Sequence, residues 1–153
     1  EVAGTIDILP TLARLAGITT LPQQHTIDGH DIWPLISGAK NAKSPHQAYY
    51  FYWGRHLQAI RSGQWKLHFP HSYRSLEGRT GGTKGKPVRY SQKRTPLALF
   101  DLANDIGEST NVIQQHADVV ARLKRLAETA RTELGDSATK QDGAGVRPPG
   151  RLE

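Results

Sequence analysis

The sequence has 153 residues, of which 37% are hydrophobic, and it fits one domain of ordinary size or one part of a larger protein. Lys and Arg outnumber Asp and Glu by 20 to 14, which gives a formal net charge of +6. The lack of cysteine excludes disulfides, thiolate metal sites and a cysteine nucleophile, and no stretch approaches the roughly 20 apolar residues of a membrane-spanning helix. Because the sequence begins with Glu1 and contains no methionine, we expect it to be part of a longer polypeptide.

The N-terminal segment predicts a short helix over residues 5–17. Thr5 or Asp7 can cap its first turn, and Gly17 can end it in the left-handed conformation. Helical spacing places four apolar side chains on one stripe, namely Leu9, Leu12, Leu15 and Ala16. Residues 18–47 contain too many prolines and glycines for a long element, so they are predicted to form a linker.

Four short runs rich in aromatic and aliphatic residues predict the strands of one antiparallel sheet. These runs are Ala48–Trp53, His56–Arg61, Gln64–Phe69 and Leu97–Leu102. Ser62 and Gly63 predict a tight hairpin turn between the second and third runs. In the third run, strand alternation places Trp65, Leu67 and Phe69 on one face and the polar Lys66 and His68 on the other.

The clearest helical pattern covers residues 117–134, with Asp118 at its N-terminal end and Gly135 after its last turn. Residues 70–96 show neither a strand nor a helix pattern and are predicted to be a long loop. Residues 136–153 are predicted to be a poorly packed, flexible tail. The expected fold class is α+β: a helix, a linker, an antiparallel sheet of about four strands, and a C-terminal helix packed on that sheet.

Positive charge is concentrated in one part of the chain. Residues 61–94 contain nine Lys or Arg and one acidic residue, Glu77, so this window carries +8. A concentrated basic segment favours anionic partners such as sulfate, phosphate, acidic glycans or nucleic acid. A solvated basic loop without a partner explains the same pattern, and the sequence leaves both explanations open.

Four phrases point to one family, because they occur here in the order in which that family has them. They are GTIDILPTLARLAG, IDGHDIWPLISG, AIRSGQWKLHF and LFDLANDIGESTNV. Together they resemble the C-terminal portion of the arylsulfatases, most closely the arylsulfatase A branch, over residues 3–135. The chain departs from the family pattern at Ile106, where the family usually has a proline.

The resemblance implies an alkaline-phosphatase-like α/β enzyme that hydrolyses sulfate esters. In that family a formylglycine and a divalent cation, usually calcium, belong to a large N-terminal domain. This chain is therefore expected to hold no catalytic residue, metal or cofactor, and to be inactive alone. Residues 1–47 would end the large domain and form a linker, residues 48–135 would form a C-terminal subdomain with the basic loop 70–96, and residues 136–153 the tail. The family also implies a periplasmic, secreted or lysosome-like location.

Four residues are candidates for substrate contact. In the family, the end of this sheet borders the active-site pocket, so His68 and His71 could hydrogen-bond a sulfate ester or its sugar. Lys66 shares the polar face with His68. Arg74 could bind a further anionic group of a polymeric substrate, together with Tyr73, Lys84 and Lys86. The alternative is that all of these are solvated surface side chains.

Other residues with metal-ligating side chains are given structural or surface roles. Asp28, His30 and Asp31 are predicted to form a turn at Gly29. The remaining histidines are predicted to lie on the surface without partners, namely His25, His46, His56 and His116.

The expected partners are a sulfate-ester substrate, which can be an anionic glycan, and the N-terminal sulfatase domain. The alternative function is a non-catalytic module that binds a sulfated glycan or a nucleic acid through residues 61–94. Few aromatic residues interleave with the basic ones, so we do not expect nucleic acid as a partner. An exposed apolar patch around Leu9, Leu12, Ile32 and Trp33 is expected to make the isolated chain self-associate.

Overall fold

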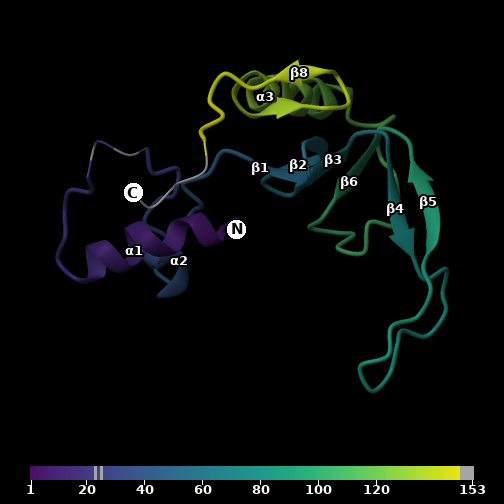
Figure 1. Cartoon of the computed structure of the whole chain (residues 1–153), viewed down its shortest axis with the longest axis horizontal. Coiled ribbons are helices and arrows are strands. Elements are labelled where there is room, and N and C mark those ends of the chain that lie inside the picture. Colours follow the sequence, from purple (N-terminus) through teal and green to yellow (C-terminus); the bar gives the residue numbers. More distant parts are fainter. Residues whose placement is uncertain (23, 25, 149–153) are drawn as a thin grey trace. The chain divides into compact units, whose positions relative to one another are not determined.

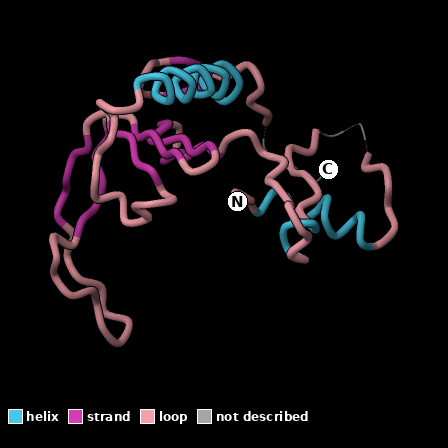
Figure 2. The backbone as a smooth tube through the Cα atoms, turned by 180° about the vertical axis from the view of Figure 1, so that it is seen from behind, coloured by secondary structure: helices cyan, strands magenta, loops and turns pink. Residues whose placement is uncertain are grey.

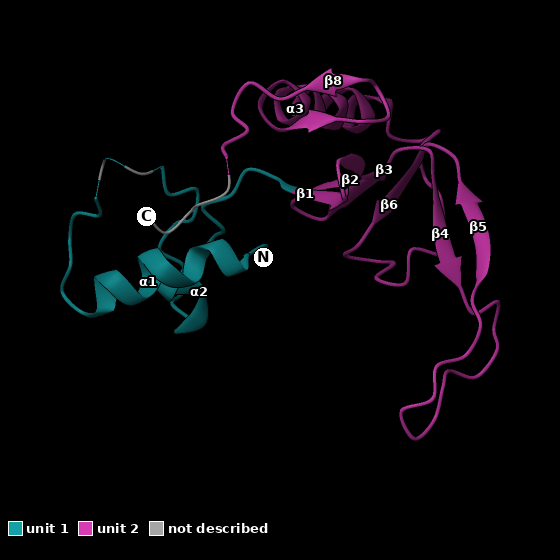
Figure 3. Cartoon of the chain, in the orientation of Figure 1, with its two compact units in different colours: residues 1–49 teal, residues 50–153 magenta. Residues whose placement is uncertain are grey.

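The computed structural model of the chain describes residues 1–22, 24 and 26–148. The chain divides into two compact units, Glu1–Tyr49 and Tyr50–Glu153, and the boundary lies two residues after the predicted one (Figure 3). The first unit contains η1 (Thr5–Asp7), α1 (Ile8–Leu15) and α2 (Trp33–Ile36). The sheet begins with β1 (Tyr49–Trp53), and the later elements are β2 (His56–Ser62), β3 (Trp65–His68), β4 (His71–Ser75), β5 (Ser91–Thr95), β6 (Ala98–Asp101), α3 (Ala117–Leu134), β7 (Gly135–Asp136) and β8 (Gln141–Asp142).

A buried carboxylate holds the first unit together. Asp7 is completely buried and accepts hydrogen bonds from the backbone N–H groups of Gly4 at 2.7 Å and His30 at 2.9 Å. The Nε2 atom of His46 lies 2.8 Å from the Oδ1 atom of Asp7. Burial by itself would raise the pKa of Asp7, but these hydrogen bonds outweigh burial and lower it. The prediction that His46 is an unpartnered surface residue is therefore wrong, and His25 lies outside the described residues.

Gly29 is required by a close backbone approach. A Cβ atom at this position would lie 1.9 Å from the carbonyl oxygen of Ile6, so no other residue fits without moving the backbone. The segment is held in place by Thr11, whose hydroxyl accepts a hydrogen bond from the backbone N–H of Ile32 at 3.0 Å. The prediction of a turn at Gly29 is wrong: residues 26–32 contain no turn, and this segment packs directly on η1 and α1.

The predicted apolar stripe of α1 faces outward in the first unit. More than half of the surface of Leu9 and of Leu12 is exposed, and Trp33 is also exposed. The inward positions of α1 are instead occupied by smaller residues, namely Pro10, Thr11 and Ala13. Ile32 was predicted to join the exposed patch, which is wrong, because it is buried beside Thr11.

The second unit is built on a four-stranded sheet in the order β1-β2-β3-β6, with α3 lying along one side of it (Figure 1). The β2–β3 and β3–β6 pairs are antiparallel, and their register places Ile60 opposite Leu67 and Leu67 opposite Leu99. This row and Leu123 of α3 are all completely inaccessible to solvent. Full burial of each such side chain contributes about 1.5–3 kcal/mol before entropy is subtracted. The predicted sheet and its C-terminal helix are confirmed.

Residues 70–96 are not the structureless loop that the sequence predicts. Their two ends form the antiparallel hairpin of β4 and β5, in which Tyr73 pairs with Lys93, and only residues 76–90 remain as a connection (Figure 2). The middle three residues of each strand are exposed. Because neither face of the hairpin is buried along its middle, the sequence has no apolar alternation by which the strands could be recognised.

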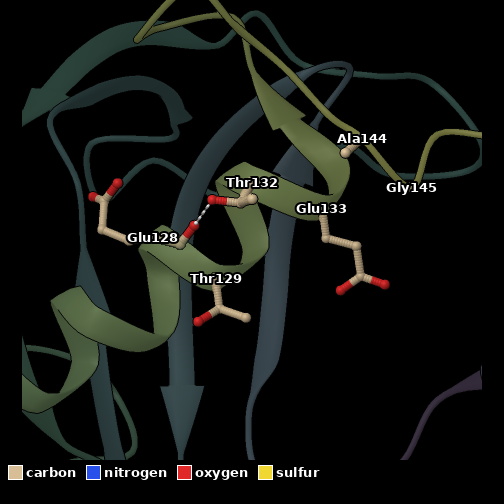
Figure 4. Close-up of a pocket in the computed structure, with 6 residues that line it drawn as sticks. All are labelled: Glu128, Thr129, Thr132, Glu133, Ala144 and Gly145. Carbon is tan, nitrogen blue, oxygen red and sulfur yellow. Dashed lines mark hydrogen bonds between the residues drawn. The ribbon is translucent and has the colours of Figure 1, made fainter.

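The start of the predicted tail is packed rather than flexible. Asp136 is buried, accepts a hydrogen bond from the Nε atom of Arg131 at 2.9 Å, and lies in the small β7–β8 pair. The backbone N–H groups of Ala144 and Gly145 donate to carbonyl oxygens in the last turn of α3, which would otherwise lack partners. This contact leaves a shallow open groove beside α3 (Figure 4), and the side chains lining it include Glu128 and Glu133.

Candidate functional site

Glu108 brings two of the predicted site residues together. Its Oε1 atom lies 2.5 Å from the Nζ atom of Lys66, and its Oε2 atom lies 2.6 Å from the Nε2 atom of His68. The Lys66 ammonium also lies 4.8 Å from the centroid of the Phe51 ring. Leu67 packs into the core that α3 covers, so strand alternation directs Lys66 and His68 to the opposite face of the sheet. Glu108 therefore partly neutralises the polar face that the sequence predicted.

The loop between β6 and α3 is closed by its own side chains, and this closure sets the position of Glu108. The carboxylate of Asp105 accepts hydrogen bonds from the backbone N–H groups of Ser109 and Thr110, at 2.8 and 2.7 Å. The amide oxygen of Asn111 accepts from the backbone N–H of Leu99 at 3.0 Å, which ties the loop to β6. Glu108 itself has φ = 53°, a conformation uncommon for a residue other than glycine. The LFDLANDIGESTN phrase thus comprises the end of β6 and a folded loop that carries one carboxylate to β3.

His71 stacks on His68, and both imidazoles have one nitrogen engaged. The two ring centroids are 5.5 Å apart with an interplanar angle of 18°. The Nδ1 atom of His71 lies 2.7 Å from the carbonyl oxygen of Phe69, which can only accept, so Nδ1 carries the proton. His68 likewise donates from Nε2 to Glu108. Within the described part of the chain, the second ring nitrogens of His68 and His71 have no hydrogen-bond partner, so in the neutral rings they are acceptors.

The surroundings of His68 favour its neutral form. Burial lowers the pKa of His68 and the nearby Lys66 ammonium lowers it further, whereas Glu108 raises it, and the lowering effects prevail. A neutral imidazole with Nε2 protonated offers a lone pair at Nδ1. Such a nitrogen accepts a hydrogen bond from a hydroxyl group but cannot donate one to a sulfate oxygen.

The structure groups three of the four predicted site residues and separates the fourth. Lys66 and His68 share Glu108, and His71 stacks on His68. Arg74 lies three residues beyond His71 along β4, which is about 10 Å at the rise of a strand. It is exposed and opposite Gln92 of β5, so it belongs to the hairpin. The other three residues and Glu108 form a group that we call the sheet cluster.

The pairing of Glu108 with the sheet was not predicted. The sequence shows that Lys66 and His68 share a face without a nearby acidic residue, which is a weak signal that a distant carboxylate joins them. Lys66 lies opposite Phe100 in the register, and Glu108 follows Phe100 by eight residues. The carboxylate of Glu108 reaches Lys66 because the loop after β6 folds back toward β3.

The described residues hold no cluster of three or more His, Cys, Asp or Glu side chains that could bind a metal ion. Asp31, one of the superficially suitable residues, forms an ion pair with Arg14 at 3.0 Å and accepts a hydrogen bond from the backbone N–H of Trp33. In the same described residues, no helix is both long enough and apolar enough to cross a lipid bilayer.

Comparison with known proteins matches residues 44–148 to a family described as the C-terminal region of aryl-sulfatase. The chain is 36% identical to human arylsulfatase A over 138 residues, which are 82% of this chain and 26% of that protein. It is 30% identical to mouse steryl-sulfatase over 148 residues, or 88% of this chain and 23% of that protein. The chain thus spans about a quarter of the length of these relatives.

A solved structure, the PsFucS1 sulfatase from Pseudoalteromonas sp., has a similar fold. It aligns with a TM-score of 0.58 and 23% sequence identity, and the alignment covers 80% of this chain and 24% of that chain. The sequence matches therefore show the family of the chain, whereas this solved structure shows a shared fold.

Proposed function

Because the chain belongs to the family formed by the C-terminal region of aryl-sulfatases, we propose that it is the C-terminal part of a sulfuric ester hydrolase. The observation that supports this proposal is the match over residues 44–148, together with relatives of 30–36% identity that are sulfatases. The relatives are about four times longer than the matched segment. The reaction therefore requires residues beyond those in this chain, and an N-terminal sulfatase domain is its main partner.

The catalytic group and the metal of such an enzyme would lie outside this chain. Family resemblance implies a formylglycine nucleophile and a divalent cation, usually calcium. This chain has no cysteine from which formylglycine could be made, and its described residues contain no suitable cluster of metal ligands. The residues present do not fit either group, so we assign them no step of sulfur–oxygen bond cleavage.

The role proposed for the sheet cluster is to orient the alcohol part of the substrate. The Nδ1 atom of His68 and the Nε2 atom of His71 are available acceptors on adjacent stacked rings, which suits the hydroxyl groups of a sugar. Lys66 is less suited to bind sulfate, because Glu108 already offsets its charge. Glu108 acts as a positioning residue that holds the His68 ring with Nε2 toward the carboxylate.

The test is sulfate release by the complete protein, expressed from the gene including the sequence upstream of Glu1. We expect hydrolysis of 4-nitrophenyl sulfate by that protein and none by the 153-residue chain. His71→Ala should raise KM for a sulfated sugar at least severalfold and leave KM for 4-nitrophenyl sulfate nearly unchanged, because the latter lacks sugar hydroxyl groups. His116→Ala is the matched control, since its ring contacts that of Trp65, with centroids 4.5 Å apart and planes tilted by 51°, and takes no part in the cluster. A complete, folded protein that releases no sulfate from either compound would contradict the proposal.

A second candidate function is a non-catalytic module that binds sulfated glycans. The concentration of nine basic residues between positions 61 and 94 favours it. This alternative predicts that the complete protein releases no sulfate but binds heparin in a salt-dependent manner.

A further inference from the structure

The β4–β5 hairpin has two faces of different character. Residues directly opposite each other in an antiparallel pair share a face, and the register pairs Ser72 with Arg94 and Arg74 with Gln92. These four residues therefore lie on one face, which we call the arginine face. All four are exposed. The other face carries Tyr73 opposite its partner on β5.

The charge on the Tyr73 face is compensated. Lys93 lies opposite Tyr73, and its ammonium is 2.7 Å from the Oε1 atom of Glu77. The other carboxylate oxygen of Glu77 accepts a hydrogen bond from Ser91 at 2.7 Å, and Arg79 donates to the same serine at 3.1 Å. Glu77, the single acidic residue of the 61–94 window, thus offsets charge on the Tyr73 face of the hairpin.

The arginine face has no such compensation. Neither Arg74 nor Arg94 has an ion pair or a side-chain hydrogen bond with any described residue. The two arginines occupy diagonal positions, which places their Cβ atoms about 7 Å apart. That spacing lets two guanidinium groups converge on one tetrahedral oxyanion or bind two neighbouring ones, with bidentate hydrogen bonds that lysine cannot form.

We propose that Ser72, Arg74, Gln92 and Arg94 form a binding strip for a sulfate or carboxylate group of an acidic oligosaccharide. The choice of a sulfated ligand rests on the proposed function, because the substrate of a sulfatase carries a sulfate group. The two arginine side chains of the strip carry hydrogen-bond donors and no acceptor. The amide of Gln92 and the hydroxyl of Ser72 provide two further donor groups. It binds an anionic group at a distance from the sheet cluster, so it selects for chains of several sugars rather than for a small sulfate ester.

The composition of the strip favours a glycan over a nucleic acid. Single-stranded nucleic acids are held by bases stacked on aromatic rings beside basic residues. Within β4 and β5, Tyr73 lies on the opposite face from Arg74 and Arg94, and the exposed Tyr90 lies in the connection just before β5. Within the two strands, the arginine face therefore offers charge and hydrogen bonds without an aromatic ring.

The test is binding of the 153-residue chain to a chondroitin sulfate hexasaccharide, measured by calorimetry at low and moderate salt. We expect Arg74→Gln/Arg94→Gln to weaken binding about tenfold, because two exposed charge-assisted contacts are lost. Lys86→Gln/Arg89→Gln removes the same charge from residues of the connection that have no side-chain partner among those described, and should weaken binding less than threefold. Arg74→Lys/Arg94→Lys should recover only part of the affinity, since the charge returns without the bidentate geometry. Circular dichroism of each variant confirms that it is folded.

Three results would overturn the proposal. Equal losses in the two charge-matched double variants would mean diffuse attraction by net charge. The chain could instead bind a DNA oligonucleotide more tightly than the hexasaccharide and lose that binding in Arg74→Gln/Arg94→Gln. This result would show that the strip binds nucleic acid. No measurable binding to the hexasaccharide at low salt would leave the strip without this ligand. Failure of the complete protein to release sulfate would contradict the proposed function alone, because this binding measurement needs no catalysis.

Discussion

Glu108→Gln tests whether the loop between β6 and α3 stabilises the sheet through its carboxylate. The amide keeps the shape of the side chain but removes the charge that lies between Lys66 and His68. The side chains of Lys66 and His68 are each 16% exposed and that of Glu108 is 26% exposed. An exposed pair contributes about 0–1 kcal/mol and breaking a buried one costs about 3–5 kcal/mol, so we expect a loss of about 2 kcal/mol. In a unit of this size, that loss lowers Tm by about 8 °C.

The same substitution changes the pKa of His68 in a direction that the geometry fixes. Glu108 is the main group that raises this pKa, whereas burial and Lys66 lower it. Glu108→Gln should therefore lower the pKa of His68 further, and Lys66→Met should raise it. The measurement is an NMR titration of the imidazole Cε1 proton, assigned with His68→Gln.

The lowered pKa of His68 also predicts how stability depends on pH. As the pH falls below about 6.5, the unfolded chain takes up a proton at this imidazole that the folded chain resists. Stability is therefore lost between that pH and the lower folded pKa, and Glu108→Gln extends the loss to lower pH.

Glu77→Gln is the matched control for the stability measurement. Its carboxylate forms an ion pair with Lys93 at a similar distance, but the two side chains are 40% and 47% exposed. We expect its Tm to equal that of the unmodified chain, because solvent screens such a pair. Equal Tm values for the Glu77 and Glu108 variants, or a higher His68 pKa in Glu108→Gln, would refute the reasoning.

Three other predictions concern the two units and the exposed helix. Asp136→Asn should cost about 3 kcal/mol in urea unfolding, because it leaves a buried guanidinium without its main partner, and an unchanged midpoint would show that this segment is not packed. Gly29→Ala should expose the first unit to protease, since its Cβ would lie 1.9 Å from a carbonyl oxygen of η1, while Gly81→Ala, with open space around it, should not. The chain should self-associate at high concentration in light scattering, and Leu9→Glu/Leu12→Glu should reduce this.

Sequence patterns predicted the elements that have one buried face. The strand around Leu67 alternates apolar and polar residues, those around Ile60 and Leu99 contain short apolar runs, and α3 repeats its apolar residues every three or four positions. The β4–β5 hairpin has polar residues on both faces, so its strands give no periodic signal. The packing of residues 135–145 was missed for another reason. It depends on the ion pair between Arg131 and Asp136 and on backbone contacts at Gly143, where a Cβ atom would lie 2.3 Å from the backbone of Leu134.

The sequence predicted that Lys66 and His68 share a face of the sheet, but it did not predict that Glu108 joins them. Alternation along β3 is a local property, and it places Lys66 and His68 on one face without knowledge of the fold. Glu108 is 40 residues beyond His68, and its pairing depends on the conformation of a loop that Asp105 and Asn111 close. A sequence phrase can identify such a loop by resemblance, but it does not show which strand the loop contacts.

The Lys66–Glu108 and Lys93–Glu77 ion pairs determine which part of the basic segment 61–94 attracts anions. In the sequence, residues 61–94 form a single segment of charge +8. In the fold, Glu108 offsets Lys66 on the sheet and Glu77 offsets Lys93 on one face of the hairpin. The field that attracts anions is therefore strongest around the uncompensated cations, among which Arg74 and Arg94 are held on one face by the strand register. An acidic chain would thus meet the arginine face first, while the near-neutral sheet cluster contacts its hydroxyl groups.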